Sequence, residues 1–139
     1  MPVPTSNRCH CIALRRANKA VTDFYDERMR PCGVTINQFA LLRTLEKLDG
    51  QSVSELAQRM RLERTTLVRS LQPLIAAGMV EDGAAAGTRN RRLRLTASGR
   101  KVLLGGAALW ENAQREFERR LGQGNTALWY EMLDRLRGL

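Results

Sequence analysis

The sequence has few of the features that secreted, membrane-spanning or disulfide-bonded proteins need. Its 139 residues include only three cysteines, Cys9, Cys11 and Cys32, an odd number that does not suit a disulfide framework. No run of 18 apolar residues occurs, which excludes a transmembrane helix of ordinary length. Residues 1–7 lack the basic stretch and the apolar segment of a signal peptide. We therefore expect a cytoplasmic protein with reduced thiols and no membrane partner.

Residues that carry catalysis or hold cofactors are also scarce. The chain has a single histidine, His10, and no glycine-rich phosphate-binding loop. No serine or cysteine is accompanied by a recognisable base and orienting carboxylate. The sequence Cys9-His10-Cys11 does not have the spacing of a common structural zinc site. We therefore expect a protein that is not an enzyme and that uses no metal or other cofactor.

Acidic residues are outnumbered, and the imbalance is local. The chain has 14 Asp and Glu against 23 Lys and Arg, a net charge of +9 at pH 7. Residues 59–101 contain ten basic and three acidic residues, so this stretch carries +7 of that total. A concentrated positive charge favours a polyanionic partner. Because the stretch shows short helix and hairpin patterns and not one long basic amphipathic helix, double-stranded DNA is the expected partner and not a membrane surface.

Hydrophobic periodicity predicts one mainly α-helical domain of the α+β class, with a single hairpin. The expected helices cover about 9–30, 36–48, 53–60, 65–77, 97–121 and 126–136, and the expected strands cover 79–82 and 91–96. Thr35 with Gln38, and Ser52 with Glu55, predict capping boxes at the start of two helices. Pro73 falls inside the fourth helix, where we expect a bend or an opened hydrogen bond.

The short connection between the helices at 53–60 and 65–77 is typical of a helix-turn-helix. On a helical wheel the second helix turns Leu67, Leu71, Leu74 and Ile75 toward the core. Its polar side chains can then enter a major groove, where Arg pairs with guanine and Gln with adenine, while the helix N-terminus favours phosphate. The residues expected to contact DNA are Arg64, Thr65, Thr66, Arg69 and Gln72. The alternative is a solvated polar face without a partner.

A basic hairpin follows the helix-turn-helix. The segment 83–90 is rich in Gly and Ala, and Arg89, Arg91 and Arg92 are expected at the hairpin tip. Guanidinium groups in that position can enter a narrow minor groove, whose negative potential attracts arginine. A solubilising basic turn is the alternative, but a helix-turn-helix followed by a basic hairpin is more specific than either part alone.

These segments together resemble the MarR family of winged-helix regulators. The similarity runs from about Cys9 onward and includes TINQFALL at 35–42, SELAQRM at 54–60, LERTTLVR at 62–69 and RRLRLTASG at 91–99. The resemblance implies a winged helix-turn-helix and a homodimer, with residues 8–34 and 97–139 as the dimerisation helices and residues 35–96 as the DNA-binding lobe of a single domain, 1–139. We expect a transcriptional repressor that binds a palindromic operator and is released by a small aromatic or phenolic inducer or by an oxidant.

The first helix also resembles that of the OhrR branch, whose members sense organic hydroperoxides as part of a stress response. Cys11-Ile-Ala-Leu matches the segment of the reactive cysteine, and Tyr25 falls where that branch has a tyrosine partner. Arg15, one helical turn after Cys11, could stabilise its thiolate. A thiol-based redox repressor using Cys11 is therefore the alternative function, against the ordinary role of a free cysteine in helix packing. A protein-interaction module without DNA binding is a further alternative, which the salt dependence of DNA binding would separate.

Overall fold

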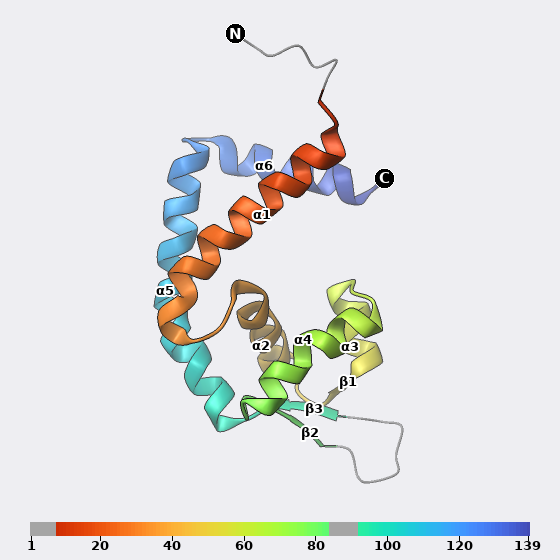
Figure 1. Ribbon diagram of the computed structural model, residues 1–139. Coiled ribbons are helices and arrows are strands. Elements are labelled where there is room, and N and C mark those ends of the chain that lie inside the picture. The colour runs from red at the N-terminus through yellow and green to blue at the C-terminus, as the bar shows by residue number, and fades with distance from the viewer. Residues whose placement is uncertain (1–7, 84–91) are drawn as a thin grey trace.

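The computed structural model describes residues 8–83 and 92–139, which form helices around a small sheet (Figure 1). In chain order the elements are α1 (His10–Met29), the 3-10 helix η2 (Arg30–Cys32), α2 (Ile36–Lys47), β1 (Gln51–Ser52), α3 (Val53–Met60), α4 (Arg64–Ala76), β2 (Val80–Asp82), β3 (Arg92–Leu95), α5 (Ala97–Leu121) and α6 (Asn125–Arg137). The predicted class, mainly helical with one hairpin, is confirmed. No helix in the described part of the chain combines the length and the apolar character that a membrane crossing requires.

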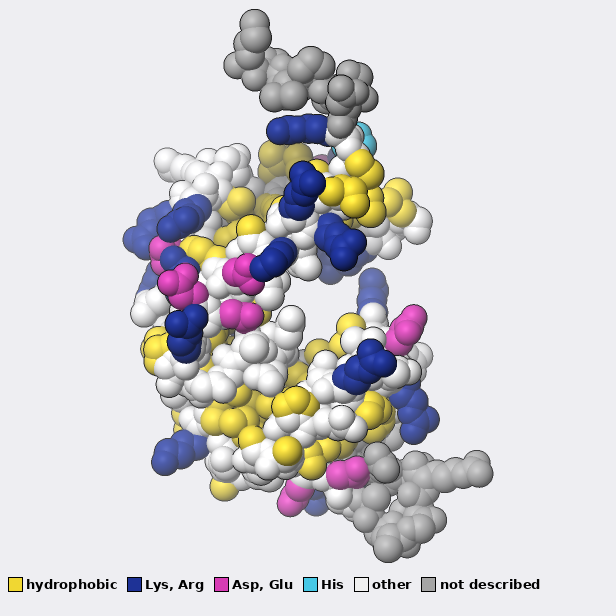
Figure 2. Space-filling model, in the orientation of Figure 1, with side chains coloured by type: hydrophobic (Ala, Val, Ile, Leu, Met, Phe, Trp, Pro, Cys, Tyr) yellow, Lys and Arg dark blue, Asp and Glu magenta, His cyan; other side chains and the backbone are white. Residues whose placement is uncertain are grey.

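The long helix α5 connects two groups of elements (Figure 1). Helices α1 and α6 lie beside the C-terminal half of α5 at one end, and we call these three elements the arm. Helices α2, α3 and α4 and the sheet lie at the other end, and we call them the lobe. The space-filling view shows the surface hollowed between the arm and the lobe (Figure 2).

The sheet is antiparallel in the order β1-β3-β2, with β3 in the centre. Leu93 and Leu95 of β3 are buried, whereas Arg92 and Arg94 are exposed, so the predicted alternation of apolar and basic side chains is confirmed. Strand β1 was not expected, because two residues are too few to show a period of two. A three-stranded sheet beside a helix-turn-helix is the arrangement of a winged helix.

Two helices of the lobe begin at their predicted capping boxes, and α5 begins at a third side-chain cap. The Thr35 hydroxyl accepts from the Gln38 backbone N–H at 3.2 Å, while the Gln38 side chain accepts from the Thr35 N–H at 2.9 Å. Ser52 and Glu55 form the same reciprocal pair at the start of α3. Thr96 caps α5 by accepting from the Gly99 N–H at 3.1 Å. Side-chain caps of this kind stabilise a helix by about 1 kcal/mol each.

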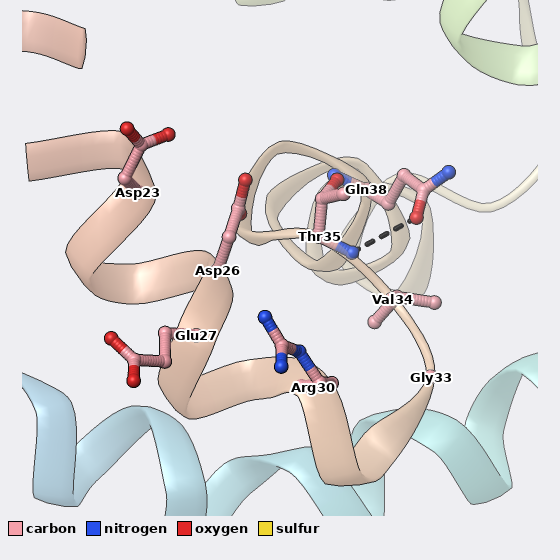
Figure 3. Close-up of a pocket in the computed structure, with 8 residues that line it drawn as sticks. All are labelled: Asp23, Asp26, Glu27, Arg30, Gly33, Val34, Thr35 and Gln38. Carbon is pink, nitrogen blue, oxygen red and sulfur yellow. Dashed lines mark hydrogen bonds between the residues drawn. The ribbon is translucent and has the colours of Figure 1, made fainter. Parts of the chain in front are cut away.

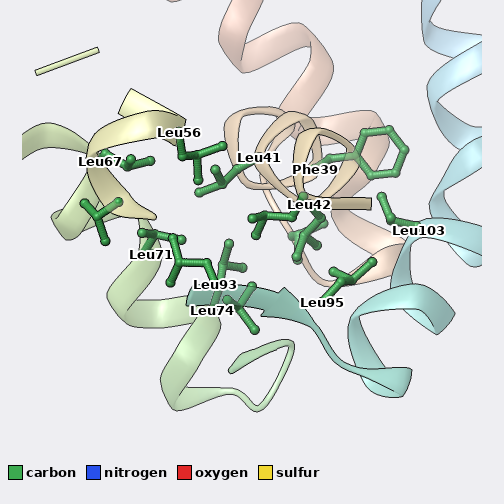
Figure 4. Packing of buried hydrophobic residues seen from close by; sticks show 14 of the residues in the cluster. Phe39, Leu41, Leu42, Leu56, Leu67, Leu71, Leu74, Leu93, Leu95 and Leu103 are labelled. Atoms are coloured by element: carbon green, nitrogen blue, oxygen red, sulfur yellow. The ribbon is translucent and has the colours of Figure 1, made fainter. Parts of the chain in front are cut away.

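The core lies mainly inside the lobe, where α2, α3 and α4 converge on β3 (Figure 4). Its fully buried side chains include Leu41, Leu42, Leu45, Leu56, Leu67, Leu74 and Leu93. Leu103 of α5 and Met29 of α1 extend the same cluster toward the arm. Because one continuous apolar cluster joins α2, α3 and α4 to β2 and β3, the positions of α3 and α4 are fixed relative to the sheet.

Two details of the fourth helix differ from the sequence prediction or refine it. Ile75, expected to face the core beside Leu74, is 37% exposed and lies in the last turn of α4, one residue before the helix ends. Pro73 lies inside α4 as predicted, and the helix continues past it to Ala76. The Ala77 N–H donates to the Pro73 carbonyl at 3.0 Å with the ordinary α-helical spacing of four residues, and the Gly78 N–H then donates to the Ile75 carbonyl at 3.0 Å, which ends the helix with a tighter turn.

Candidate nucleic-acid interface

The turn between α3 and α4 is made by a residue in a conformation that non-glycine residues rarely adopt. Arg61 has φ 53°, in the left-handed region, and caps α3 through bonds from its N–H to the Ala57 and Gln58 carbonyls. The next N–H, that of Leu62, donates to the Ala57 carbonyl at 2.9 Å. These bonds reverse the chain within a few residues and set the direction in which α4 leaves α3.

Helix α4 separates a buried face from a polar face. Leu67, Leu71 and Leu74 are 0%, 2% and 1% exposed and anchor the helix to the core. The five residues predicted to contact DNA are all exposed: Arg64, Thr65, Thr66, Arg69 and Gln72. The structure therefore brings these side chains to the surface of one rigid helix, which is the requirement for insertion into a major groove.

The N-terminus of α4 is open to an anion. Glu63 occupies the N-cap position with an extended backbone, and within the described part of the chain no side chain caps this end. The first backbone N–H to bond inside the helix is that of Leu67, to the Glu63 carbonyl at 3.0 Å. The preceding N–H groups, with the positive end of the helix dipole, are suited to contact a phosphate.

The structure describes one of the predicted wing arginines. Arg92 was expected both within the strand at 91–96 and among the arginines of the hairpin tip. It begins β3 and lies opposite Ser52 of β1, which places it at the base of the wing. It lines a recess of about 330 Å³ together with Asp49 and Glu55. The pairing of Arg92 with β1 was not predicted, because β1 gave no sequence signal. The other two predicted wing residues, Arg89 and Arg91, lie outside the described residues.

Two exposed arginines near this surface were not among the predicted site residues. Arg61 lies at the turn before α4, and Arg94 lies on β3 opposite Glu81. Both had been included in the local charge excess, but their placement depends on the turn and on strand pairing. The alternation of Leu93, Arg94 and Leu95 predicts an outward-facing Arg94, but this side chain was not included among the expected DNA contacts.

The proposed redox residues are not brought together within one chain. Cys9 and Cys11 are exposed at the start of α1, whereas Tyr25 is buried and its hydroxyl donates to the Gln114 side chain. Tyr25 follows Cys11 by fourteen residues on the same helix, which separates them by about 21 Å along its axis. Contact between this thiol and this phenol would therefore need a second copy of the chain. Cys32 is half-buried, and its thiol donates to the Met29 carbonyl at 2.9 Å.

A cleft lies where α1 ends and α2 begins (Figure 3). Its volume is about 540 Å³, and it is lined by Asp23, Asp26, Glu27, Arg30, Gly33, Val34, Thr35 and Gln38. One carboxylate also bridges the two helices, because Asp26 accepts from the Ile36 N–H at 2.8 Å. Three carboxylates against one guanidinium give the lining a net negative charge, so the cleft is better suited to neutral or cationic molecules than to anions.

Comparison with known proteins identifies relatives of the same architecture. The model of the MarR family matches residues 33–89. The crystal structure of the transcriptional regulator MosR from M. tuberculosis is 30% identical, with 95% of this chain and 96% of that chain covered and a TM-score of 0.78. MosR in complex with DNA is 34% identical, with 93% of each chain covered and a TM-score of 0.81.

A third structure shares the fold at lower identity. The repressor CouR bound to p-coumaroyl-CoA is 24% identical, with 93% of this chain and 91% of that chain covered and a TM-score of 0.82. The comparison with curated proteins finds no match. At this level of identity CouR supports the fold alone.

Proposed function

The chain belongs to the MarR family, and from this premise we propose that it is a transcriptional repressor that binds a palindromic DNA operator as a homodimer. The observation that carries the proposal is the exposed polar row of α4 on a helix whose opposite face is fully buried. Arg69 and Gln72 are assigned to base edges, with Thr65 and Thr66 beside them. Arg64 and the open helix N-terminus are assigned to phosphate.

In this mechanism the two-fold axis of the dimer sets the spacing between paired α4 helices. Each α4 would occupy one of two successive major grooves, and each wing would reach the flanking minor groove. Arg89, Arg91 and Arg92 are assigned to the wing contacts. A promoter covered in this way is closed to transcription. A relative that has been solved in complex with DNA, MosR, supports this assignment of the lobe.

The apolar surface of the arm supports a dimer. Large hydrophobic side chains at both ends of the chain are 41–53% exposed: Ile12, Leu14, Leu128, Met132 and Leu136. Leu128, Met132 and Leu136 are four residues apart on α6 and so share one face of that helix, and an exposed apolar face of this kind marks an interaction site. We assign residues 8–34 and 97–139 to dimerisation and residues 35–96 to DNA binding, within one domain.

The cleft at the end of α1 is the proposed inducer site, because it lies at the junction of these two parts. Its charge favours a small phenol over an aromatic acid, since a phenol stays neutral near pH 7 whereas a carboxylate would meet Asp23, Asp26 and Glu27. A ligand there would act by favouring a dimer whose α4 spacing no longer fits the operator. The Asp26 contact with the start of α2 connects the cleft to the lobe.

A thiol-based signal is the second candidate, and the exposure of Cys11 favours it. A sensing thiol must be reached by its oxidant. Cys9 is equally exposed and is the natural comparison, whereas Cys32 is half-buried and bonded to a carbonyl.

The test is fluorescence anisotropy on DNA from upstream of the protein's own gene. Reduced protein is expected to bind this DNA with a Kd that rises steeply with salt, because phosphate contacts release counterions. Absence of salt-dependent binding would instead favour a protein-interaction module and would overturn the proposal. Each protein is then treated with an organic hydroperoxide or with neutral phenols, using Cys11→Ser, with Cys9→Ser and Cys32→Ser as matched controls. Loss of DNA binding on peroxide treatment in wild type and in both control variants, but not in Cys11→Ser, would establish the thiol mechanism. Loss of DNA binding with a phenol and not with peroxide would establish the ligand mechanism.

A further inference from the structure

A second, smaller cavity lies within the arm, where α1, α5 and α6 meet. Its volume is about 120 Å³, and its lining comprises Val21, Tyr25, Gln114, Phe117, Glu118, Thr126, Trp129 and Tyr130. Each helix contributes residues three or four positions apart, so each presents one continuous face to the cavity. The cavity shares no lining residue with the cleft at the end of α1.

Aromatic rings make up half of this lining. The rings of Tyr25 and Phe117 have centroids 5.9 Å apart and planes tilted by 48°, and Phe117 meets Trp129 at 5.7 Å and 65°. Tyr25 is held in place because it is buried and its hydroxyl donates to Gln114. Tyr130 is 52% exposed and stands at the open side. Tilted rings from three helices therefore surround a small volume without filling it.

The charge of this site comes from one carboxylate. Among the described residues that line the cavity, Glu118 is the only charged one. It lies close enough to Tyr25 that its charge, after burial and together with Tyr130, helps to raise the pKa of that phenol. Two arginines of the same helices, Arg28 and Arg120, are both directed to Glu116 and to the ring of Phe24. The cavity thus combines aromatic faces with a negative charge and without a competing cation in its lining.

We propose that this cavity binds the head group of a small organic cation of the quaternary ammonium class. Aromatic faces attract cations through the ring quadrupole, and the attraction is strongest for weakly hydrated heads whose desolvation is easy. A nearby carboxylate adds to the same preference. Pockets for drug-sized ligands have volumes of roughly 300–1,000 Å³, so a cavity this small accommodates a head group, with any substituent leaving past the exposed Tyr130.

The site and the proposed repressor mechanism can fail separately. Cation binding is a property of the arm and is measured without DNA. The cleft at the end of α1 is the internal comparison, because it has three carboxylates but no aromatic residue in its lining. A cation attracted by negative charge alone would prefer that cleft, whereas one recognised by rings would prefer the cavity in the arm.

The probe is choline, compared with 3,3-dimethylbutan-1-ol, a neutral molecule of the same shape. Binding to the full-length protein is measured by calorimetry and by the fluorescence of Trp129 in a Trp110→Phe variant, which has no other tryptophan. Choline is expected to bind saturably and roughly tenfold or more tightly than the neutral analogue. Glu118→Gln and Trp129→Leu are expected to weaken choline binding, whereas Glu111→Gln on the same helix and Glu27→Gln in the other cleft are expected to leave it unchanged.

Circular dichroism and thermal melting of each variant check folding, and Glu118→Gln carries the test should Trp129→Leu fail to fold. Three results would overturn the proposal: no saturable binding of choline, equal affinity for the neutral analogue, or loss of binding in Glu27→Gln but not in Glu118→Gln.

Discussion

Arg28 of α1 donates two hydrogen bonds to the carboxylate of Glu116 on α5, and both are 2.7 Å long. The same guanidinium lies over the ring of Phe24, 3.4 Å from its centroid. Bidentate pairs of this kind fix orientation as well as distance. The pair therefore holds the angle at which α1 crosses α5, and with it the geometry of the arm.

The stability of the protein should depend on this pair in acid. The hydrogen bonds from Arg28, with the charges of the neighbouring arginines, lower the pKa of Glu116 from 4.5 to about 2. Because the folded pKa is depressed, the stabilisation is fully present above pH 4.5 and is lost as the pH falls toward 2. We expect Glu116→Gln to melt at a lower temperature than wild type at neutral pH, and the two melting temperatures to converge across this interval.

The control is Glu111→Gln, which removes an exposed carboxylate from the same helix. Its melting temperature should follow that of wild type at every pH. A difference between wild type and Glu116→Gln that stays constant as the pH falls would contradict an ionised carboxylate as its source.

Arg69 provides the test of sequence recognition. We expect Arg69→Ala to lose about 1–3 kcal/mol of binding to the operator and little binding to random DNA, because a base contact carries discrimination and a phosphate contact does not. Arg64→Ala should weaken both DNAs to a similar extent, and Arg135→Ala on α6 should weaken neither. Anisotropy titrations on operator and random duplexes measure the ratio. An unchanged ratio in Arg69→Ala would remove its base-reading role.

Two adjacent glycines of α5 should respond in opposite ways to alanine. A Cβ at Gly106 would lie 2.7 Å from the Phe39 ring, which is itself buried, so Gly106→Ala should cost about 1–3 kcal/mol of stability. A Cβ at Gly105 would meet nothing within 4 Å, so Gly105→Ala should add up to about 1 kcal/mol through helix propensity. Urea unfolding of the two variants beside wild type measures both. A Gly106→Ala variant as stable as wild type would contradict the close packing of α5 against Phe39, and a destabilised Gly105→Ala would contradict the open space beside that residue.

The lobe was predictable because its signals are local. The partners in each capping box are three residues apart, and the spacing of Leu67, Leu71 and Leu74 places α4 directly. The prediction that Ile75 faces the core was wrong, because its exposure depends on which elements lie beside the last turn of α4 and a helical wheel does not include neighbouring elements. Sequence periodicity defines a face, and tertiary packing decides whether that face is covered.

The cavity in the arm and the contacts of Arg92 were not predictable from local signals. Phe117 and Trp129 fall on apolar stripes that the sequence interprets as core or dimer contacts. They line one cavity with Tyr25 only because α1 packs against α5 and α6, which brings together residues about ninety positions apart in the sequence. The position of Arg92 likewise depends on its pairing with β1, across about forty positions. Contacts between distant segments of this kind carry no periodic signal within either segment.

Arg92 at the base of the wing gives the last prediction. It lines one recess with Asp49 and Glu55, so the carboxylates compete with phosphate for its guanidinium. We expect Asp49→Asn to tighten DNA binding and to make the slope of log K against log salt more negative by up to about one unit, as for one further phosphate contact. Asp49→Asn in an Arg92→Ala background should have a much smaller effect, because the guanidinium that Asp49→Asn would free to contact phosphate is absent. Anisotropy over a series of salt concentrations measures all four proteins as a double-mutant cycle. If Asp49→Asn acted equally in both backgrounds, its effect would be general charge repulsion, and Arg92 would have to be removed from the DNA-binding residues of the wing.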